Sequence, residues 1–208
     1  MILLIITDGR RDLLERTLES AKQSLPEFEK KIIINDCQDP VFKSFLNSLY
    51  DYEVYHNHEK LGFSGAIQKG WDVLPHTDYV FHLEEDFTFN EKVDIDKMKD
   101  ILQDDKICQV SLKRQKWGAE IEGFIEDNPQ EYEQMDGYVR HRNFFTTNPS
   151  LYKYDLTKIG FPQVKRSEFE FSKKLFNLGF YSAILGGKFD PPKVTHTGVN
   201  QSVNAKGY

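Results

Sequence analysis

Three consecutive acidic residues near the middle of the chain could hold a cation. Glu84, Glu85 and Asp86 directly follow the apolar run VFHL. Carboxylates this close repel one another unless a cation lies among them, and their hard oxygens suit Mg²⁺ or Mn²⁺. The triplet therefore predicts a divalent-metal site whose open positions take phosphate oxygens and water. Taken alone, it leaves open that the acids only cap the next element or face water.

A second segment suits an anionic ligand. The run LGFSGAIQKGW places small residues around an expected helix start: Gly62, Ser64, Gly65, Ala66 and Gly70. Small residues let the backbone approach a ligand, and the amides of a first helical turn attract anions. The run is not GxGxxG, and it follows the third expected strand instead of the first. A dinucleotide-dependent dehydrogenase is therefore disfavoured.

Short apolar runs alternate with amphipathic helical patterns through the first half of the chain. This alternation predicts an α/β fold in which crossover helices join parallel strands. The expected strands cover residues 2–6, 31–34, 52–56 and 78–83. The expected helices cover residues 13–24, a stretch that begins at Asp39-Pro40, and residues 62–71. Asp12 is the expected cap of the first helix. Each strand ends in a polar loop at the same edge of the sheet, where open α/β sheets bind ligands.

The second half is less regular. Residues 113–143 are polar and aromatic and show no clear period, so we expect a long functional loop there. Four of its aromatic residues could stack on a sugar or base, or could anchor the loop: Trp117, Phe124, Tyr132 and Tyr138. Regular patterns return over residues 144–154, a helix over 167–178 and an apolar run over 180–185.

Length and charge exclude several classes. The 208 residues suit one domain, and the formal charge of -6 disfavours tight, sequence-independent capture of nucleic acid. Two basic clusters could still form a local groove for a polyanion, although solvated loop charges are the favoured interpretation. The clusters are Lys113, Arg114 and Lys116, and Arg140, His141 and Arg142.

The two cysteines indicate the compartment. Cys37 and Cys108 each lie in or beside an apolar run, which favours two buried thiols and a reducing, cytoplasmic setting over a disulfide framework. The opening MILLIITDGRR has neither the basic start nor the small-residue cleavage site of a signal peptide, and no stretch is long enough for a membrane anchor.

The order of four motifs resembles that of the GT-A glycosyltransferases, particularly the family-two group and its small bacteriophage-type members. The motifs are IITDGRRDLLERTLES, IIINDCQ, GFSGAIQKG and FHLEEDF, and they cover about the first ninety residues. The resemblance implies a GT-A, Rossmann-like fold with a mostly parallel central sheet flanked by helices. It also implies one domain over residues 1–208, with a nucleotide-sugar and metal half at 1–111 and an acceptor half at 112–208.

The resemblance implies roles for single residues of the donor half. The nucleotide side comprises Thr7, Asp8, Arg10, Asp36, Gly62, Gly65, Gln68, Glu84 and Glu85. Asp86 is the implied main metal ligand, Glu84 a ribose or metal partner, and His196 in KVTHTGVN completes the metal shell. Glu84 and Glu85 replace the family's usual Asp, and Gln68 replaces its customary Asn. Simple turn roles for Asp8 and Asp36 stay open, as does a structural role for His196.

The acceptor half carries a second match. RSEFEFSKKLFNLGF resembles the family stretch in which an acidic pair opens a helix, and this places Glu168 as the catalytic base of an inverting transfer. Stabilisation of the helix dipole by first-turn acids is the alternative. FTTNPSLYKYDL resembles the strand and loop beside the acceptor. The implied acceptor-side residues are Trp117, Asn148, Tyr152 and Glu170, with Lys188 or Lys193 near the leaving group.

The expected function is transfer of a sugar from a nucleoside-diphosphate sugar, with UDP as the expected nucleotide and Mn²⁺ or Mg²⁺ as cofactor, onto an unidentified hydroxyl. A glycan, a protein or a modified nucleobase remains open as acceptor, including DNA bases or virion proteins of a bacteriophage. A non-catalytic nucleotide-sugar or glycan-binding protein is the alternative. A nucleotidyltransferase is disfavoured because no Gly-rich loop with a basic residue directly follows the first strand. The sequence determines neither the sugar nor the oligomeric state.

Overall fold

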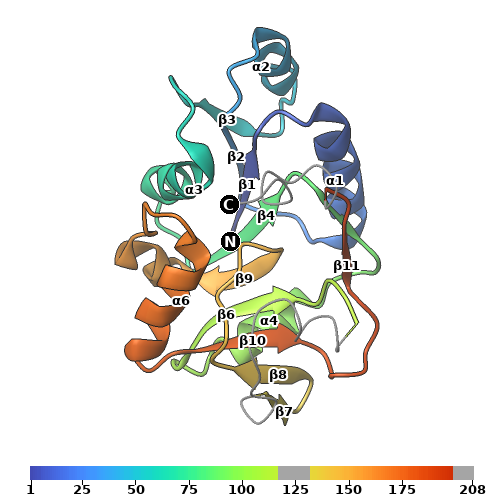
Figure 1. Cartoon of the computed structure of the whole chain (residues 1–208). Coiled ribbons are helices and arrows are strands. Elements are labelled where there is room, and N and C mark those ends of the chain that lie inside the picture. The colour runs from blue at the N-terminus through green and yellow to red at the C-terminus, as the bar shows by residue number, and fades with distance from the viewer. Residues whose placement is uncertain (117–131, 199–208) are drawn as a thin grey trace.

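A mixed β-sheet forms the centre of the protein, and the computed structural model describes residues 1–116 and 132–198 (Figure 1). Nine described strands pair in the order β3-β2-β1-β4-β9-β6-β10-β8-β7. They are β1 Ile2–Thr7, β2 Lys30–Asn35, β3 Glu53–His56, β4 Tyr79–Glu84, β6 Ile107–Leu112, β7 Glu133–Met135, β8 Tyr138–His141, β9 Ser150–Lys153 and β10 Tyr181–Leu185. Two further strands, β5 Phe87–Phe89 and β11 Val194–His196, form a separate antiparallel pair.

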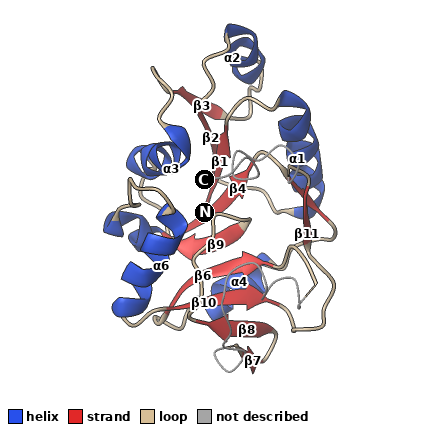
Figure 2. Ribbon diagram, in the orientation of Figure 1, coloured by secondary structure: helices blue, strands red, loops and turns tan. Residues whose placement is uncertain are grey.

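Helices cover both faces of the sheet (Figure 2). They are α1 Arg11–Ser24, α2 Pro40–Asn47, α3 Gly62–Val73, α4 Ile95–Ile101 and α6 Ser167–Asn177, with the 3-10 helix η2 Tyr154–Ile159. Strand β1 is buried along its whole length, and its side chains alternate between two cores. Leu3 and Ile5 pack towards α1, α2 and α4, whereas Leu4 and Ile6 pack towards α3 and α6. A strand buried on both faces reads as a continuous apolar run, which is what residues 2–6 show.

The predicted α/β class and the mostly parallel sheet are confirmed. Strand β1 pairs in parallel with β2 and β4, and β2 pairs in parallel with β3. Strand β9 is antiparallel between β4 and β6, while β6 and β10 run parallel to each other. The carboxyl ends of β1, β2, β3 and β4 therefore meet at one edge, as the sequence predicted.

Two predictions about element ends have different outcomes. Asp39 caps α2, since its Oδ1 accepts a hydrogen bond from the amide of Val41 at 2.9 Å. Asp12 does not cap α1: this helix begins at Arg11, two residues before its predicted start, and Asp12 lies in its first turn, paired with Arg16 on the surface. Arg10 occupies the cap position without a side-chain hydrogen bond to the helix.

The expectation of a structureless loop over residues 113–143 is wrong for its later part. Strands β7 and β8 form an antiparallel hairpin in which Met135 pairs with Tyr138 across the two-residue turn Asp136-Gly137. Gly137 has a φ of 77°, a conformation that glycine adopts readily. The strands are too short and polar to show a period, but the Asp-Gly pair is itself a hairpin signal.

Tyr152 belongs to the core, so its predicted place on the acceptor side is wrong. The side chain is 0% exposed, and its hydroxyl accepts a hydrogen bond from Trp71 Nε1 at 3.0 Å. The same hydroxyl lies 3.4 Å from His82 Nδ1. Tyr152 therefore joins β9 to α3 and β4 inside the protein.

Both cysteines are free thiols; Cys108 is buried and Cys37 is half-buried. Burial raises the pKa of the Cys108 thiol to about 12, so this thiol stays protonated. Within the described residues, no helix has the length and apolar character needed to cross a bilayer.

Candidate functional site

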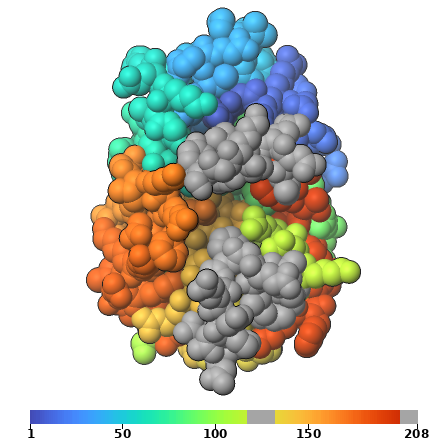
Figure 3. All heavy atoms as spheres, viewed as in Figure 1, coloured from blue at the N-terminus to red at the C-terminus, as the bar shows by residue number. Residues whose placement is uncertain are grey.

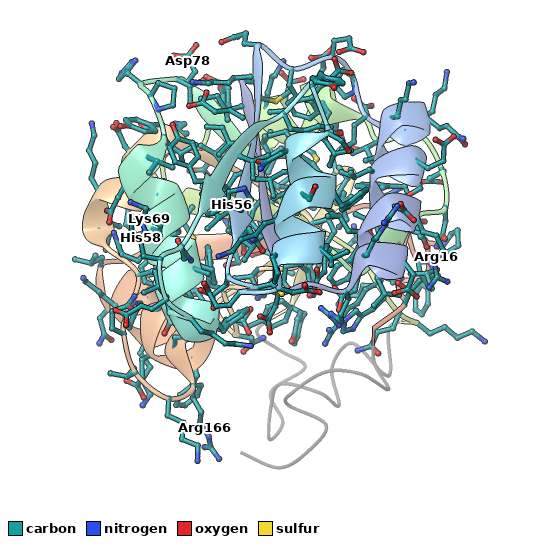
Figure 4. All side chains as sticks on the ribbon, turned by 90° about the horizontal axis from the view of Figure 1, so that it is seen from above. Arg16, His56, His58, Lys69, Asp78 and Arg166 are labelled. Carbon is teal, nitrogen blue, oxygen red and sulfur yellow. The ribbon has the colours of Figure 1, made fainter. Side chains whose placement is uncertain are left out.

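The predicted donor-side residues meet at the carboxyl edge of the sheet. Ile6 pairs with Glu84, and Thr7 pairs with Asn35, so the loops after β1, β2 and β4 are neighbours. In Figure 4, Asp78, which precedes β4, and Arg166, which precedes α6, project from opposite sides of the protein. Strand β4 begins on the side of Asp78, so its end at Glu84 lies on the side of Arg166. Helix α6 starts on that side too, and Glu168 follows Arg166 by two residues.

Glu85 is the anchor of the loop that follows β1. Its side chain is 1% exposed and accepts hydrogen bonds from the Thr7 hydroxyl, from Arg10 Nε at 2.6 Å and from the Arg10 amide at 3.2 Å. Its backbone oxygen accepts a hydrogen bond from Thr17 Oγ1 at 2.7 Å. Both carboxylate oxygens of Glu85 are therefore engaged within the protein, and the side chain is too buried for the predicted nucleotide contact. Thr7, 1% exposed, is likewise turned towards Glu85.

Asp86 lies between two positively polarised groups. Its Oδ2 is 2.9 Å from Arg10 Nη1 and 3.1 Å from His196 Nε2. Burial works to raise the pKa of Asp86, but the contacts with His196 and Arg10 outweigh it and lower that pKa. The carboxylate is therefore ionised, and its other oxygen, Oδ1, is buried without a hydrogen-bond partner among the residues that the structure describes.

Pairing of β11 with β5 brings His196 to Asp86. His196 pairs with Phe87, and the two rings stack with centroids 4.6 Å apart. Thr197 adds two hydrogen bonds to the backbone oxygen of Asp86, from its amide at 2.8 Å and its hydroxyl at 2.9 Å. In Figure 3 the red segment that ends in β11 accordingly lies among blue and green atoms of the first half of the chain.

The residue after this contact has to be small. A Cβ on Gly198 would come within 2.1 Å of Asp86 Oδ2 and 2.7 Å of Arg10 Nη1. The backbone at Gly198 therefore closes one side of the carboxylate.

The Asp86–His196 pair fits a divalent cation. A carboxylate with one unsatisfied buried oxygen beside an imidazole nitrogen is a suitable partial ligand set for Mn²⁺ or Mg²⁺. In residues 1–116 and 132–198, no three His, Cys, Asp or Glu side chains converge on one metal position. The predicted set of Glu84, Asp86 and His196 is thus not assembled as three ligands, and the remaining positions would fall to phosphate oxygens and water.

Thr147 contacts two other acids of the site, Glu84 and Glu168, and the sequence analysis missed this residue. Its amide and hydroxyl donate to Glu168 Oε1 at 2.7 and 3.0 Å, and the hydroxyl also lies within hydrogen-bond reach of Glu84. Burial, together with the nearby charge of Asp86, raises the pKa of Glu84 to about 8. Burial also raises the pKa of Glu168, and the hydrogen bonds from Thr147 oppose this rise. The site thus combines an ionised acid with two acids that hold protons more readily.

The predicted nucleotide residues near α3 make hydrogen bonds within the protein. Asp36, 3% exposed, accepts hydrogen bonds from Asn57 Nδ2 at 2.8 Å and from the amides of Leu61 and Gly62 at 2.7 and 2.8 Å. Asp36 thus holds the start of α3 from the end of β2, which differs from the local turn role that the sequence left open. Asp8, by contrast, is exposed and pairs with Lys60 at 2.8 Å.

Gln68 and the glycines shape the start of α3. Gln68 Oε1 accepts a hydrogen bond from the amide of Phe161 at 2.7 Å, so it ties α3 to the segment before α6. Gly62 has a φ of 74°, and a Cβ on Gly65 would lie 2.7 Å from Leu61 Cβ. These positions hold the local backbone, and Gln68 is engaged within the protein instead of facing a ligand.

The other acceptor-side predictions have mixed outcomes. Asn148 is half-buried beside Thr147, whereas Glu170 forms a surface pair with Lys173 at 3.1 Å. Two helical positions turn a side chain by about 200°, so Glu170 faces away from Glu168. Tyr132 is a buried anchor in a cluster with Val139, Phe144 and Ile184, and Tyr138 is half-buried in β8. Trp117 and Phe124 lie outside the described residues.

Four side chains of the two basic clusters are buried or bonded within the protein. Lys113 is 1% exposed, and burial lowers the pKa of the fully enclosed His141 to about 3, which keeps it neutral. Arg140 pairs with Glu133 at 2.5 Å, and Arg142 donates to the backbone oxygen of Phe176. Of the lysines predicted near the leaving group, Lys193 pairs with Glu91, and the backbone of Lys188 contacts Gln134 and Lys113.

Comparison with known proteins decides the family. The family model described as Glycosyl transferase family 2 matches residues 3–165. The chain belongs to glycosyl transferase family 2. Membership in this family confirms the predicted class of enzyme, a glycosyltransferase. No curated protein matches the sequence.

Two similar solved structures agree with the predicted GT-A fold. A structure of GalNAc-T7 with UDP, GalNAc and Mn²⁺ is 14% identical, with a TM-score of 0.68, over 89% of this chain and 42% of that chain. The mannosyltransferase PcManGT from Pyrobaculum calidifontis, in complex with GDP-Man and Mn²⁺, is 12% identical, with a TM-score of 0.68, over 99% of this chain and 59% of that chain. This family 2 chain thus spans 42% and 59% of these two proteins, and at such identities the likeness establishes the fold.

The ion pair between Arg10 and Glu85 gives a testable contribution to stability. We expect Arg10→Met to lower the free energy of unfolding by roughly 2–3 kcal/mol, measured by urea denaturation. This lies below the roughly 3–5 kcal/mol of a fully buried pair because the Arg10 side chain is 27% exposed. The matched control is Arg16→Met, which removes a surface pair with Asp12 worth about 0.5 kcal/mol or less. Equal losses in both variants would contradict the anchoring role.

Proposed function

We propose that this family 2 protein transfers a sugar from a nucleoside-diphosphate sugar to a hydroxyl acceptor with the help of Mn²⁺ or Mg²⁺. The observation that carries the proposal is the Asp86–His196 pair at the strand edge, with one buried carboxylate oxygen that no described residue satisfies. The two similar structures, solved with Mn²⁺ and either UDP or GDP-Man, support a nucleotide-sugar donor. We take UDP as the nucleotide to test first.

Asp86 and His196 would hold the cation in this proposal. When bound, the cation supplies the positive charge that offsets the negative charge developing on the leaving diphosphate. Arg10 is anchored by Glu85 and has its guanidinium beside Asp86, so it can add a fixed positive charge at the same place. The donor half, residues 1–111, together with His196 from the second half, would thus supply the electrostatic part of the catalysis.

Glu168 would act on the acceptor. A carboxylate that takes the proton of the acceptor hydroxyl strengthens this oxygen as a nucleophile, and attack on the anomeric carbon from the side opposite the leaving group inverts that centre. Thr147 fixes the position of Glu168 through two hydrogen bonds to one oxygen. The side chain of Thr146 also donates a hydrogen bond to this carboxyl group. The acceptor half, residues 112–208, would position the hydroxyl in front of it.

The acceptor itself stays open among a glycan, a protein and a modified nucleobase, including those of a bacteriophage. Lys113 and Arg142 bind backbone oxygens of the protein itself, which disfavours a polyanion groove built from these two residues. We further propose a reducing compartment, supported by the two free thiols.

Ligand-induced stabilisation tests the donor site. A ligand that binds the folded state raises the melting temperature. We expect one nucleoside diphosphate or nucleotide sugar from a panel to raise Tm only when Mn²⁺ or Mg²⁺ is present, and we expect Asp86→Ala to abolish this shift. The control is Asp12→Ala, an acid on the surface of α1. No Tm shift with any donor would contradict the proposed function.

Substitution of the base tests the catalytic step. We expect Glu168→Gln to lower kcat about 10²- to 10⁴-fold while the affinity for the donor stays unchanged. The assay is release of the nucleoside diphosphate in the presence of panels of glycan, peptide and nucleic-acid acceptors. Glu170→Gln, on the same turn of α6 but facing away, is the matched control. Retention of anomeric configuration in the product, assigned by NMR, would overturn this role of Glu168.

The pH dependence follows from the raised pKa of Glu168. A base works only when deprotonated, so activity is present above its pKa and falls as the pH drops through it. Because burial raises this pKa above the ordinary value of 4.5, we expect the acid limb of kcat/KM above pH 4.5. Glu84→Gln should leave this limb in place. An acid limb that disappears in that variant would assign the titration to Glu84 instead.

A further inference from the structure

Lys113 is a buried lysine directly after β6, and its ammonium group binds a distant turn. The side chain is 1% exposed, and Nζ donates to the backbone oxygens of Lys188 at 2.7 Å and Asp190 at 2.5 Å. A buried ammonium costs several kcal/mol unless hydrogen bonds satisfy it. This requirement fixes the turn at residues 187–190 against the end of β6.

The backbone of Lys113 holds the segment that follows this turn. Its carbonyl oxygen accepts hydrogen bonds from the amide of Lys193 at 2.8 Å and from the amide of Val194 at 3.2 Å. Val194 is the first residue of β11. One residue therefore holds the chain before β11 through its side chain and the start of β11 through its backbone.

The position of β11 decides where His196 lies. Val194 pairs with Phe89 and His196 with Phe87, and residues two apart in a strand point to the same side. The imidazole then reaches Asp86 at 3.1 Å. On the other side, Asn90 binds the backbone oxygens of Pro192 and Lys193, each at 2.9 Å. The segment before β11 is thus held between β6 and the end of β5.

We propose that Lys113 is a positioning residue for the cation site: by fixing residues 188–194 it places His196 beside Asp86. This inference rests on the proposed function, because it concerns the same Asp86–His196 pair. A lysine suits the position because its flexible stem carries several donors to two carbonyl oxygens, and a methionine of similar length has none.

Binding of Mn²⁺ to the full chain tests the inference without any turnover assay. We expect K113M to weaken Mn²⁺ binding about 10-fold, measured from the EPR signal of free Mn²⁺. The matched control is K174M, which also removes a hydrogen bond from a lysine to a backbone oxygen, that of Ile159 at 2.8 Å, but does so on α6. K174M should bind Mn²⁺ like the parent protein. K113Q, which keeps a donor, replaces K113M in the same measurement if K113M does not fold.

A double-mutant cycle with H196A separates positioning from general stability. If Lys113 acts through His196, K113M has little further effect on Mn²⁺ affinity once His196 is removed. Unchanged Mn²⁺ affinity in K113M, or effects that simply add to those of H196A, would overturn the inference and leave the proposed function standing. Unchanged Mn²⁺ affinity in H196A would instead refute the proposed cation pair, and the role of Lys113 with it.

Discussion

Burial of the Glu85 carboxylate is the constraint around which the site is organised. An ionised carboxyl group without water costs several kcal/mol unless opposite charge and hydrogen bonds surround it. Thr7 and Arg10 meet that need, which draws the loop after β1 across the end of β4. The backbone oxygen of Arg10 then accepts the first amides of α1, from Leu13 and Leu14, so the same contact sets where that helix begins. Its guanidinium is left pointing at Asp86.

Around this anchor the three acids of the triplet differ in chemistry although they are neighbours in sequence. Asp86 is ionised between Arg10 and His196. Glu84 faces Thr147, and burial raises its pKa to about 8. Glu85 accepts the hydrogen bonds from Thr7 and Arg10 that hold the loop after β1. Environments that separate the proton affinities of nearby carboxyl groups are common where acids share catalytic work. The surroundings, more than the residue type, therefore determine what each acid can do.

The sequence predicted those elements whose apolar pattern is long. Strands β1, β2 and β4 are continuous apolar runs in the sequence, and α1 shows helical spacing. The fold class and the ligand-binding edge could therefore be predicted. Strands β5 and β11 have three residues each and carry no period, so their pairing was not visible. The triplet located the site but not the anchor, because the burial of Glu85 depends on Arg10, 75 positions away. Tyr152 was misplaced for a similar reason: its partner Trp71 is 81 positions away.

The contact between His196 and Asp86 joins residues 110 positions apart, and this has a consequence for synthesis. Chains fold from the N-terminus as they leave the ribosome. Strands β1 to β4 are complete once Glu84 has emerged, so the parallel core can assemble while the second half is still being made. His196 is synthesised more than a hundred residues after Glu84. Until then the nascent chain presents Asp86 without its partner, and the Asp86–His196 contact is among the last of these contacts to form.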